Sequence, residues 1–214
     1  MDYSAVILAG GSSKRFGQDK GLAQLGNKPL VKHVLDAIGD IVKEKIVVVS
    51  SKAQAENYRR ILSVEAHVVV DAGGIQTPLV GVLTGFEAAG GEYSIVLPCD
   101  VPFVSRDVVS LLLELCINKA AVIPRWPNCY IEPLHAVYRT QLALEAAKTP
   151  LSKGELDLKA MVDRLRGVRY VSTLVLQQLD PQLRTFFNVN TALDLKKAES
   201  MLKRPNSYSS SLPK

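Results

Sequence analysis

The clearest candidates for chemistry lie near the start of the chain, in a glycine-rich loop that carries several cations. Residues 8–22 read LAGGSSKRFGQDKGL and follow the short apolar run 5–8. Gly10 and Gly11 allow consecutive backbone N–H groups to turn toward one point, which forms a nest for an anion. Three cationic side chains stand in the same loop: Lys14, Arg15 and Lys20. The loop therefore predicts a binding site for the phosphates of a nucleotide.

A solvated basic turn is the structural alternative, and the spacing of the loop differs from two common phosphate-binding motifs. It lacks G-x-x-x-x-G-K-[ST], because Gln18 and Asp19 separate Gly17 from Lys20. The dinucleotide fingerprint G-x-G-x-x-G is absent as well. Its position still favours a ligand site, because the loop follows a predicted strand and open α/β sheets bind ligands at the carboxyl ends of strands.

A second candidate site follows a later apolar run, where residues 97–103 read LPCDVPF. Asp100 stands there between two prolines at the end of a predicted strand. A carboxylate oxygen suits Mg²⁺ that arrives on nucleotide phosphates. The alternative role for Asp100 is to begin a turn or to cap the next helix. Its combination with the glycine-rich loop favours the metal.

Asp71 is another carboxylate at a predicted strand end, after the run 67–70 and before Gly73 and Gly74. It could contact the base or the sugar of a nucleotide. An Asx turn into the two glycines is the structural alternative.

The composition favours one large α/β domain. The chain has 214 residues, of which 47% are hydrophobic, enough to bury a sizeable core. The formal net charge of +5 is spread along the chain, and a phosphorylated small-molecule substrate accounts for it. Only 6% of the residues are aromatic, with no base-stacking or recognition-helix motif, so we expect no nucleic-acid partner.

The cysteines and apolar runs predict a cytoplasmic protein. Cys99, Cys116 and Cys129 are an odd number without a C-x-x-C pair, which argues against a disulfide framework or a zinc site. The apolar runs are far shorter than the ~20 residues that cross a bilayer. Glycines also interrupt the N-terminal run before it could form the core of a signal peptide. We therefore expect no membrane partner.

Apolar, mostly β-branched runs alternate with helical patterns along the chain. Strands are predicted at 5–8, 46–49, 67–70, 94–97 and 121–123, and helices at 29–38, 54–62, 79–89, 107–117, 141–147, 156–166 and 192–202. This alternation predicts a single doubly wound, mostly parallel α/β sheet, Rossmann-like, with helices on both faces. An extra strand at 133–138 would pair at a mixed or antiparallel edge. We expect one domain over residues 1–203 and a disordered tail over the serine- and proline-rich residues 204–214.

Over nearly its full length the chain resembles the molybdenum cofactor guanylyltransferases, nucleotidyltransferases of the nucleotide-diphospho-sugar transferase fold. The shared motifs are LAGG at 8–11 with Ser13, Arg15, Gly17, Asp19, Lys20 and Leu22, then NKPL at 27–30, TPLVG at 77–81, PCDVP at 98–102, EPLHAVYR at 132–139 and FNVNT at 187–191 with Asp194 and Leu195.

The resemblance implies transfer of GMP from GTP to the phosphate of molybdopterin, with Mg²⁺ as the cofactor and pyrophosphate as the other product. It also implies molybdoenzymes or cofactor-insertion proteins as possible recipients. The acceptor is a phosphate monoester with a second pKa of about 6, so it is largely dianionic at neutral pH and needs no general base. The difficulty is to bring two polyanions together, which requires cations and positioning.

The site residues that the resemblance implies fall into three groups. Leu8, Ala9, Gly10, Gly11, Lys20, Asp71 and Asp100 bind GTP, and Asp100 also binds Mg²⁺. Arg15, Lys20 and Asp100 are the catalytic candidates, with Arg15 on the leaving pyrophosphate. His135, Asn188 and Asn190 are candidates for binding the acceptor. Strand packing is the alternative role for the histidine, and turn formation is the alternative for the two asparagines.

Two other functions compete with this interpretation. Related guanylyltransferases often carry an asparagine after the second strand, where this chain has Ser50 and Ser51, which leaves base selectivity open. A cytidylyltransferase for the same cofactor, or for another phosphometabolite, is therefore an alternative. Gly10 argues against it, because related cytidylyltransferases commonly have alanine there and glycine leaves more room for a purine. The second alternative is a non-catalytic adaptor that binds nucleotide or cofactor.

Overall fold

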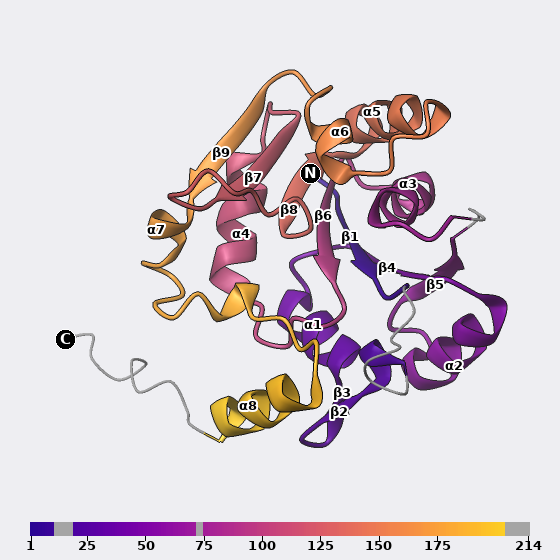
Figure 1. Cartoon of the computed structure of the whole chain (residues 1–214), viewed down its shortest axis with the longest axis vertical. Coiled ribbons are helices and arrows are strands. Elements are labelled where there is room, and N and C mark those ends of the chain that lie inside the picture. The colour runs from indigo at the N-terminus through magenta and orange to yellow at the C-terminus, as the bar shows by residue number, and fades with distance from the viewer. Residues whose placement is uncertain (11–18, 72–74, 204–214) are drawn as a thin grey trace.

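The computed structural model describes residues 1–10, 19–71 and 75–203. Its centre is a seven-stranded sheet with the order β5-β4-β1-β6-β8-β7-β9 (Figure 1). All strands run in one direction except β8, which pairs antiparallel with β6 and β7. The strands of the sheet are β1 (Tyr3–Leu8), β4 (Glu44–Val49), β5 (His67–Val70), β6 (Tyr93–Pro98), β7 (Ala121–Arg125), β8 (Ala136–Arg139) and β9 (Val168–Ser172).

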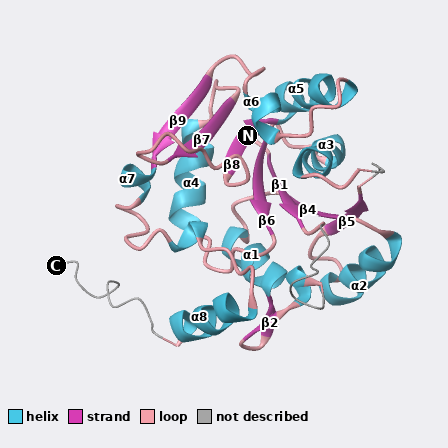
Figure 2. Cartoon of the chain, viewed as in Figure 1, coloured by secondary structure: helices cyan, strands magenta, loops and turns pink. Residues whose placement is uncertain are grey.

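Helices cover both faces of the sheet (Figure 2). Successive side chains of a strand point to opposite faces, so Ala5 and Ile7 of β1 belong to one core and Val6 to the other. The first core includes residues of α1 (Leu30–Ile38), α2 (Lys52–Leu62) and α4 (Arg106–Leu115). The second includes residues of α3 (Pro78–Ala88), α5 (Thr140–Ser152) and α6 (Leu158–Val162). The predicted doubly wound, mostly parallel α/β sheet is confirmed.

The strand order changes direction beside β1, the first strand. Along the chain, β4 is the next strand of this sheet after β1. It lies on one side of β1, and β6 lies on the other side. The Ala9 N–H donates to the Val48 carbonyl at 2.8 Å, and the Cys99 N–H donates to the Leu8 carbonyl at 3.0 Å. The segments that leave β1 and β6 therefore begin side by side, at the kind of switch point where such sheets bind ligands.

A small third core attaches the C-terminal helix to the hairpin β2 (Gln24–Leu25) and β3 (Lys28–Pro29). Its buried residues are Ala23, Leu25, Leu30, Val189 and Ala198. The helix, α8 (Ala192–Leu202), has the bounds that the sequence predicts. The Val189 N–H donates to the Asp100 carbonyl at 2.9 Å. This contact brings the C-terminal segment to the carboxyl end of β6.

The prediction of an edge strand at 133–138 is wrong in position and length. The strand β8 covers only Ala136–Arg139 and lies inside the sheet, between β6 and β7. Its first three residues, Ala136, Val137 and Tyr138, are completely buried because helices cover both faces of the sheet there. The polar His135, which the prediction placed inside the strand, precedes it.

Other differences concern element ends and segments without a clear pattern. The strand β9 was not predicted, because it is an edge strand whose sequence VRYVS is only partly buried. The predicted helix at 156–166 shortens to α6, and the one at 141–147 lengthens to α5. Two further short helices are α7 (Thr173–Leu176) and the 3-10 helix η2 (Arg184–Phe186). The predicted tail lies outside the described residues. In the described part of the chain, every helix is too short or too polar to span a membrane.

Candidate active site

Asp100 follows the carboxyl end of β6 and is 7% exposed. Its Oδ2 accepts an ion-paired hydrogen bond from the Lys20 ammonium, which comes from a segment 80 residues earlier. Its Oδ1 is buried and has no hydrogen-bond partner among the described residues. An unsatisfied buried carboxylate oxygen is costly, so this atom marks a place for a cation or a donor supplied by a ligand.

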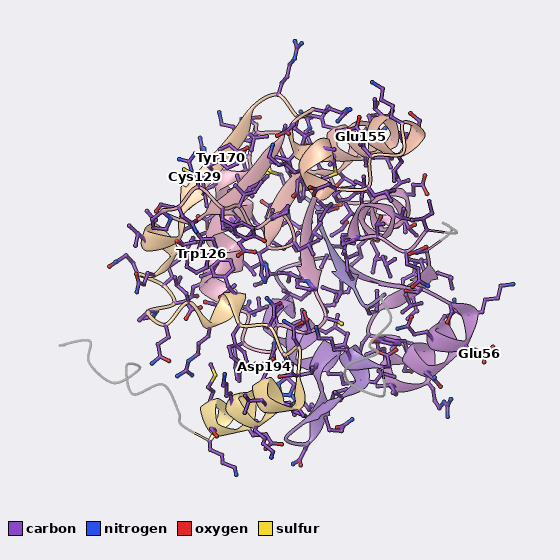
Figure 3. All side chains as sticks on the ribbon, in the orientation of Figure 1. Glu56, Trp126, Cys129, Glu155, Tyr170 and Asp194 are labelled. Atoms are coloured by element: carbon purple, nitrogen blue, oxygen red, sulfur yellow. The ribbon has the colours of Figure 1, made fainter. Side chains whose placement is uncertain are left out.

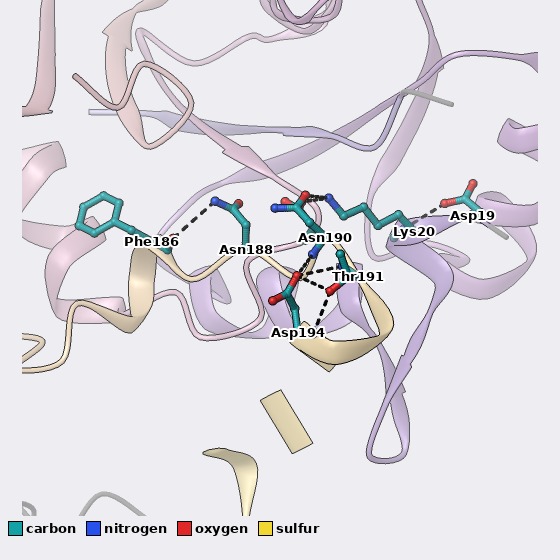
Figure 4. A network of polar contacts seen from close by, with 9 residues as sticks. Asp19, Lys20, Phe186, Asn188, Asn190, Thr191 and Asp194 are labelled. Carbon is teal, nitrogen blue, oxygen red and sulfur yellow. Dashed lines mark hydrogen bonds and ion pairs between the residues drawn. The ribbon is translucent and has the colours of Figure 1, made fainter. Parts of the chain in front are cut away.

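Lys20 opens the short 3-10 helix η1 (Lys20–Leu22), which follows the glycine-rich loop. Besides Asp100, its ammonium donates to Oδ1 of Asn190 at 2.5 Å (Figure 4). One cation thus joins the first loop, the end of β6 and the segment before α8. A lysine at the carboxyl edge of the sheet can neutralise phosphate charge when a nucleotide is bound.

Asp19 holds the amino end of η1 in place. Its Oδ1 accepts from the Gly21 N–H at 3.1 Å and from the Tyr58 hydroxyl at 2.8 Å. Its Oδ2 accepts from Gln54 Nε2 at 2.6 Å. Gln54 and Tyr58 belong to α2, which packs on the sheet beside β4 and β5.

The residues fit a metal of the Mg²⁺ type. Among the described residues there is no group of three or more His, Cys, Asp or Glu side chains that could hold an ion. Among the described residues, Asp100 beside Lys20 has a buried carboxylate oxygen without a hydrogen-bond partner. Mg²⁺ in proteins is commonly bound through one or two carboxylates, with substrate phosphates and water as its other ligands.

The predicted nucleoside-binding residues lie along the carboxyl edge of the sheet. Leu8 ends β1, and Gly10 is exposed just beyond it. A methyl group on Gly10 would lie 2.6 Å from Ser50 Oγ, so Ser50 already occupies the space that the missing side chain leaves. The role of Gly10 in the choice of base stays a prediction. Asp71 follows β5, and its N–H donates to the Val49 carbonyl at 2.8 Å.

Two predicted residues of the glycine-rich loop, Gly11 and Arg15, lie outside the described residues. Their roles remain predictions.

The acceptor candidates come from two segments, one before β8 and one before α8. Because β8 is antiparallel, its amino end shares the edge at which β6 ends, and His135 precedes Ala136, the partner of Val96. His135 is 3% exposed, its ring lies 5.1 Å from that of Phe186, and burial lowers its pKa to about 4. Asn188 is exposed, with Nδ2 3.5 Å from the Phe186 carbonyl.

Of these acceptor candidates, Asn190 alone contacts the lysine and carboxylate pair directly in the described part of the chain. Further along the same edge, Trp126 follows β7 and donates from Nε1 to Glu132 at 2.7 Å. It lies on the same side of the molecule as Tyr170 of β9 (Figure 3).

Sequence reasoning missed the supporting residues of this site. Gln54 and Tyr58 stand four residues apart in a predicted helix, the spacing that puts two side chains on one face. Nothing in that spacing says which face meets the loop. Asp19 is one of the residues shared with the family, and no role was predicted for it. Its position directly before Lys20 is nevertheless typical of a helix cap.

A mostly parallel sheet with a lysine and a carboxylate at its switch point is an arrangement that can bind a nucleotide and its phosphates, as a nucleotidyltransferase must. The family model described as MobA-like NTP transferase domain matches residues 5–177, and the chain belongs to that family. A probable molybdenum cofactor guanylyltransferase of Methanosarcina mazei is 34% identical over 90% of this chain and 88% of its own. A molybdenum cofactor guanylyltransferase of Desulfosudis oleivorans is 30% identical over 94% and 96%.

Solved structures agree with this membership. The molybdopterin-guanine dinucleotide biosynthesis protein A of Archaeoglobus fulgidus has a TM-score of 0.79 and 28% identity, covering 94% of this chain and 98% of its own. The 2-C-methyl-D-erythritol 4-phosphate cytidylyltransferase of Thermus thermophilus has a TM-score of 0.70 at 20% identity, covering 95% and 100%, which shows the common fold alone.

Proposed function

We propose that this chain transfers GMP from GTP to the phosphate of molybdopterin, with Mg²⁺ as its metal. The observation that carries the proposal is the ion pair of Lys20 with Asp100 at the switch point, with Asp100 Oδ1 buried and without a hydrogen-bond partner among the described residues. The names of the relatives support guanine as the base and the molybdenum cofactor as the acceptor, and the name of the Archaeoglobus fulgidus protein supports molybdopterin. The new bond joins an acceptor phosphate oxygen to the α-phosphorus, and the bond from the α-phosphorus to the bridging oxygen breaks as pyrophosphate leaves.

The chain's own residues supply charge and position for this reaction. When bound, Mg²⁺ would neutralise phosphate charge beside Asp100. Lys20 would place its ammonium against the phosphates, where a preorganised cation stabilises charge that develops in the transition state. Asn190 accepts from the same ammonium and limits the directions in which Lys20 can point. No residue is needed as a general base, because the acceptor phosphate is already dianionic.

The remaining sites belong to the same proposal. Leu8, Ala9, Gly10, Gly11 and Asp71 would hold the nucleoside, and Arg15 would bind the pyrophosphate. His135, Asn188 and Asn190 would face the acceptor. We include a cytoplasmic location, since all three cysteines are free, and molybdoenzymes or cofactor-insertion proteins as recipients of the product.

Pyrophosphate release tests the proposal. The purified chain is mixed with Mg²⁺ and a molybdopterin-bearing acceptor, and GTP, CTP and ATP are compared. We expect release with GTP only, and its loss in Asp100→Asn, which keeps the shape of the side chain but removes its charge. Release with CTP would move the function to a cytidylyltransferase. Tight GTP binding without release from any nucleotide would favour a non-catalytic adaptor.

A further inference from the structure

The Asp19 carboxylate is fully engaged by the protein itself. Among the described residues it accepts hydrogen bonds from the Gly21 N–H, the Tyr58 hydroxyl and the Gln54 amide, so both oxygens have donors. A carboxylate bonded in this way has little capacity left for a metal or a substrate hydroxyl. Although Asp19 is the neighbour of Lys20, its contacts therefore indicate a structural connection and no direct part in the chemistry.

The two α2 side chains that donate to Asp19, Gln54 and Tyr58, are themselves held in place. Tyr58 is completely buried, and burial raises the pKa of its phenol, so the hydroxyl stays a neutral donor at any physiological pH. Gln54 also donates to the Ala9 carbonyl at 2.9 Å and accepts from the Ser50 N–H at 2.8 Å. Because these two groups follow β1 and β4, the Gln54 side chain ties α2 and Asp19 to the carboxyl edge of the sheet.

The residue after Lys20, Gly21, is also closely packed. A methyl group on Gly21 would lie 2.2 Å from the Tyr58 hydroxyl oxygen and 2.9 Å from Cys99 Sγ. Gly21 is therefore wedged between α2 and the residue that precedes Asp100. Lys20 has Asp19 before it and Gly21 after it, so its backbone is held on both sides and at a set distance from Asp100.

We infer that Asp19, Gln54 and Tyr58 form a positioning network that acts through Lys20, with the Tyr58 hydroxyl as its most remote member. The inference rests on the proposed function, in which the Lys20 ammonium contacts the phosphates. Among the described residues, the Tyr58 hydroxyl donates to Asp19 and has no hydrogen bond to Lys20. Its role is to fix the Asp19 carboxylate, because small displacements of a reacting or charge-stabilising group are costly in rate.

The test is Tyr58→Phe, which removes one oxygen and keeps the buried ring. We expect kcat for GMP transfer to fall by roughly tenfold. The apparent dissociation constant for Mg²⁺ should stay within about twofold of the parent value. Tyr93→Phe is the matched control, because Tyr93 is also buried in the first core and its hydroxyl accepts from the Asn118 N–H at 3.1 Å, at the opposite end of β6. This control should retain the parent kcat.

A double variant separates positioning from general stability. In a Lys20→Ala background, Tyr58→Phe should change kcat by less than about twofold, because the network has no lysine left to position. Equal losses in both backgrounds, or a parent-like kcat in Tyr58→Phe alone, would overturn the inference while leaving the proposed function intact.

If the parent chain does not turn over GTP, the proposed function fails. The parent, Tyr58→Phe, Lys20→Ala and the double variant are then compared by calorimetry of Mg·GTP binding. The positioning network then predicts a several-fold weaker affinity in Tyr58→Phe that disappears in the Lys20→Ala background. Additive losses of affinity would contradict the inference, and a parent that binds no nucleotide would contradict both proposals.

Discussion

At the scale of single residues, the site consists of a few charges in a tightly packed setting. Lys20 has a side chain 23% exposed and Asp100 one 10% exposed, so their ion pair is partly shielded from solvent. One oxygen of the carboxylate is committed to the lysine and the other is not. In such an arrangement the two side chains are already in position before a polyanionic ligand and its metal bind.

Removing the Lys20 ammonium should damage catalysis far more than folding. We expect Lys20→Ala to lower kcat by about 10² to 10³, the cost of losing one preorganised electrostatic group. The free energy of unfolding should fall by about 2 to 3 kcal/mol, because Lys20 makes a charged hydrogen bond to Asp100 and a second one to Asn190. Steady-state pyrophosphate release and urea denaturation measure the two effects. A loss of stability in proportion to the loss of rate would make Lys20 a structural residue.

His135 should make the stability of the protein depend on pH. Its pKa in the folded chain is about 4, against 6.5 for an ordinary histidine. Between these values the unfolded chain binds a proton that the folded chain does not, so stability is present above pH 6.5 and is lost as the pH falls toward 4. The full loss is on the order of 3 kcal/mol, at 1.36 kcal/mol for each pKa unit.

Urea denaturation at pH 7 and pH 5, in the parent and in His135→Phe, measures this effect. Phenylalanine keeps a buried ring and removes the titrating group, together with the 3.7 Å contact between Nδ1 of His135 and Oε2 of Glu132. Burial raises the pKa of the neighbouring Glu132, which works in the opposite direction, so the difference between the two proteins is the informative quantity. Equal pH dependence in the two would show that His135 is not the group responsible.

At the scale of elements, the start of α8 links helix stability to the active site. Thr191 and Asp194 form a capping box, in which the Thr191 hydroxyl accepts from the Asp194 N–H and the Asp194 carboxylate accepts from the Thr191 N–H. The same carboxylate also accepts from the N–H of Asn190 at 3.1 Å. The cap therefore fixes the backbone of the residue whose side chain contacts Lys20.

Loss of this cap should affect both stability and rate. We expect Thr191→Ala to lower the free energy of unfolding by about 1 kcal/mol, as for other N-caps, and to lower kcat by roughly threefold through a less ordered Asn190. Thr191→Ser keeps the capping hydroxyl and should behave as the parent. Thermal unfolding and pyrophosphate release check both values. A stability loss without any change in kcat would separate the cap from the site.

At the scale of the whole molecule, the site is built from distant parts of the chain. The family model matches residues 5–177, yet Asn190 lies beyond that range and contacts Lys20. The third core explains this, since α8 and Val189 pack on the hairpin β2 and β3 beside the first loop. The C-terminal segment is thus part of the site, although most of the sheet is complete before it.

Two truncations test this division of the chain. A chain that ends at Lys203 should have the thermal stability and kcat of the parent, because residues 204–214 are mostly polar and have little to bury. A chain that ends at Phe187 should lose most of its turnover, because it lacks Asn190 and α8. It should also unfold at a lower temperature, since Leu25 and Leu30 of the third core become exposed. Parent-like turnover in the shorter chain would contradict the role of this segment.

The sequence by itself determined the fold class and the approximate positions of most of the parallel strands. Buried parallel strands are continuous apolar runs, so β1, β4, β5 and β6 could be located from composition alone. Gly10, Lys20 and Asp100 stood out because each follows such a run with a chemistry that phosphate or metal requires. These features are local, and local patterns are what a sequence displays directly.

Only the tertiary structure decided which residues meet. Strand order brings the end of β6 beside β1, and the antiparallel direction of β8 brings His135 to the same edge. The contact of Asn190 with Lys20 spans 170 residues, and Tyr58 reaches Asp19 from the one face of α2 that meets η1. Such contacts depend on how helices pack against a twisted sheet, and packing between distant segments leaves no periodic signal in the chain.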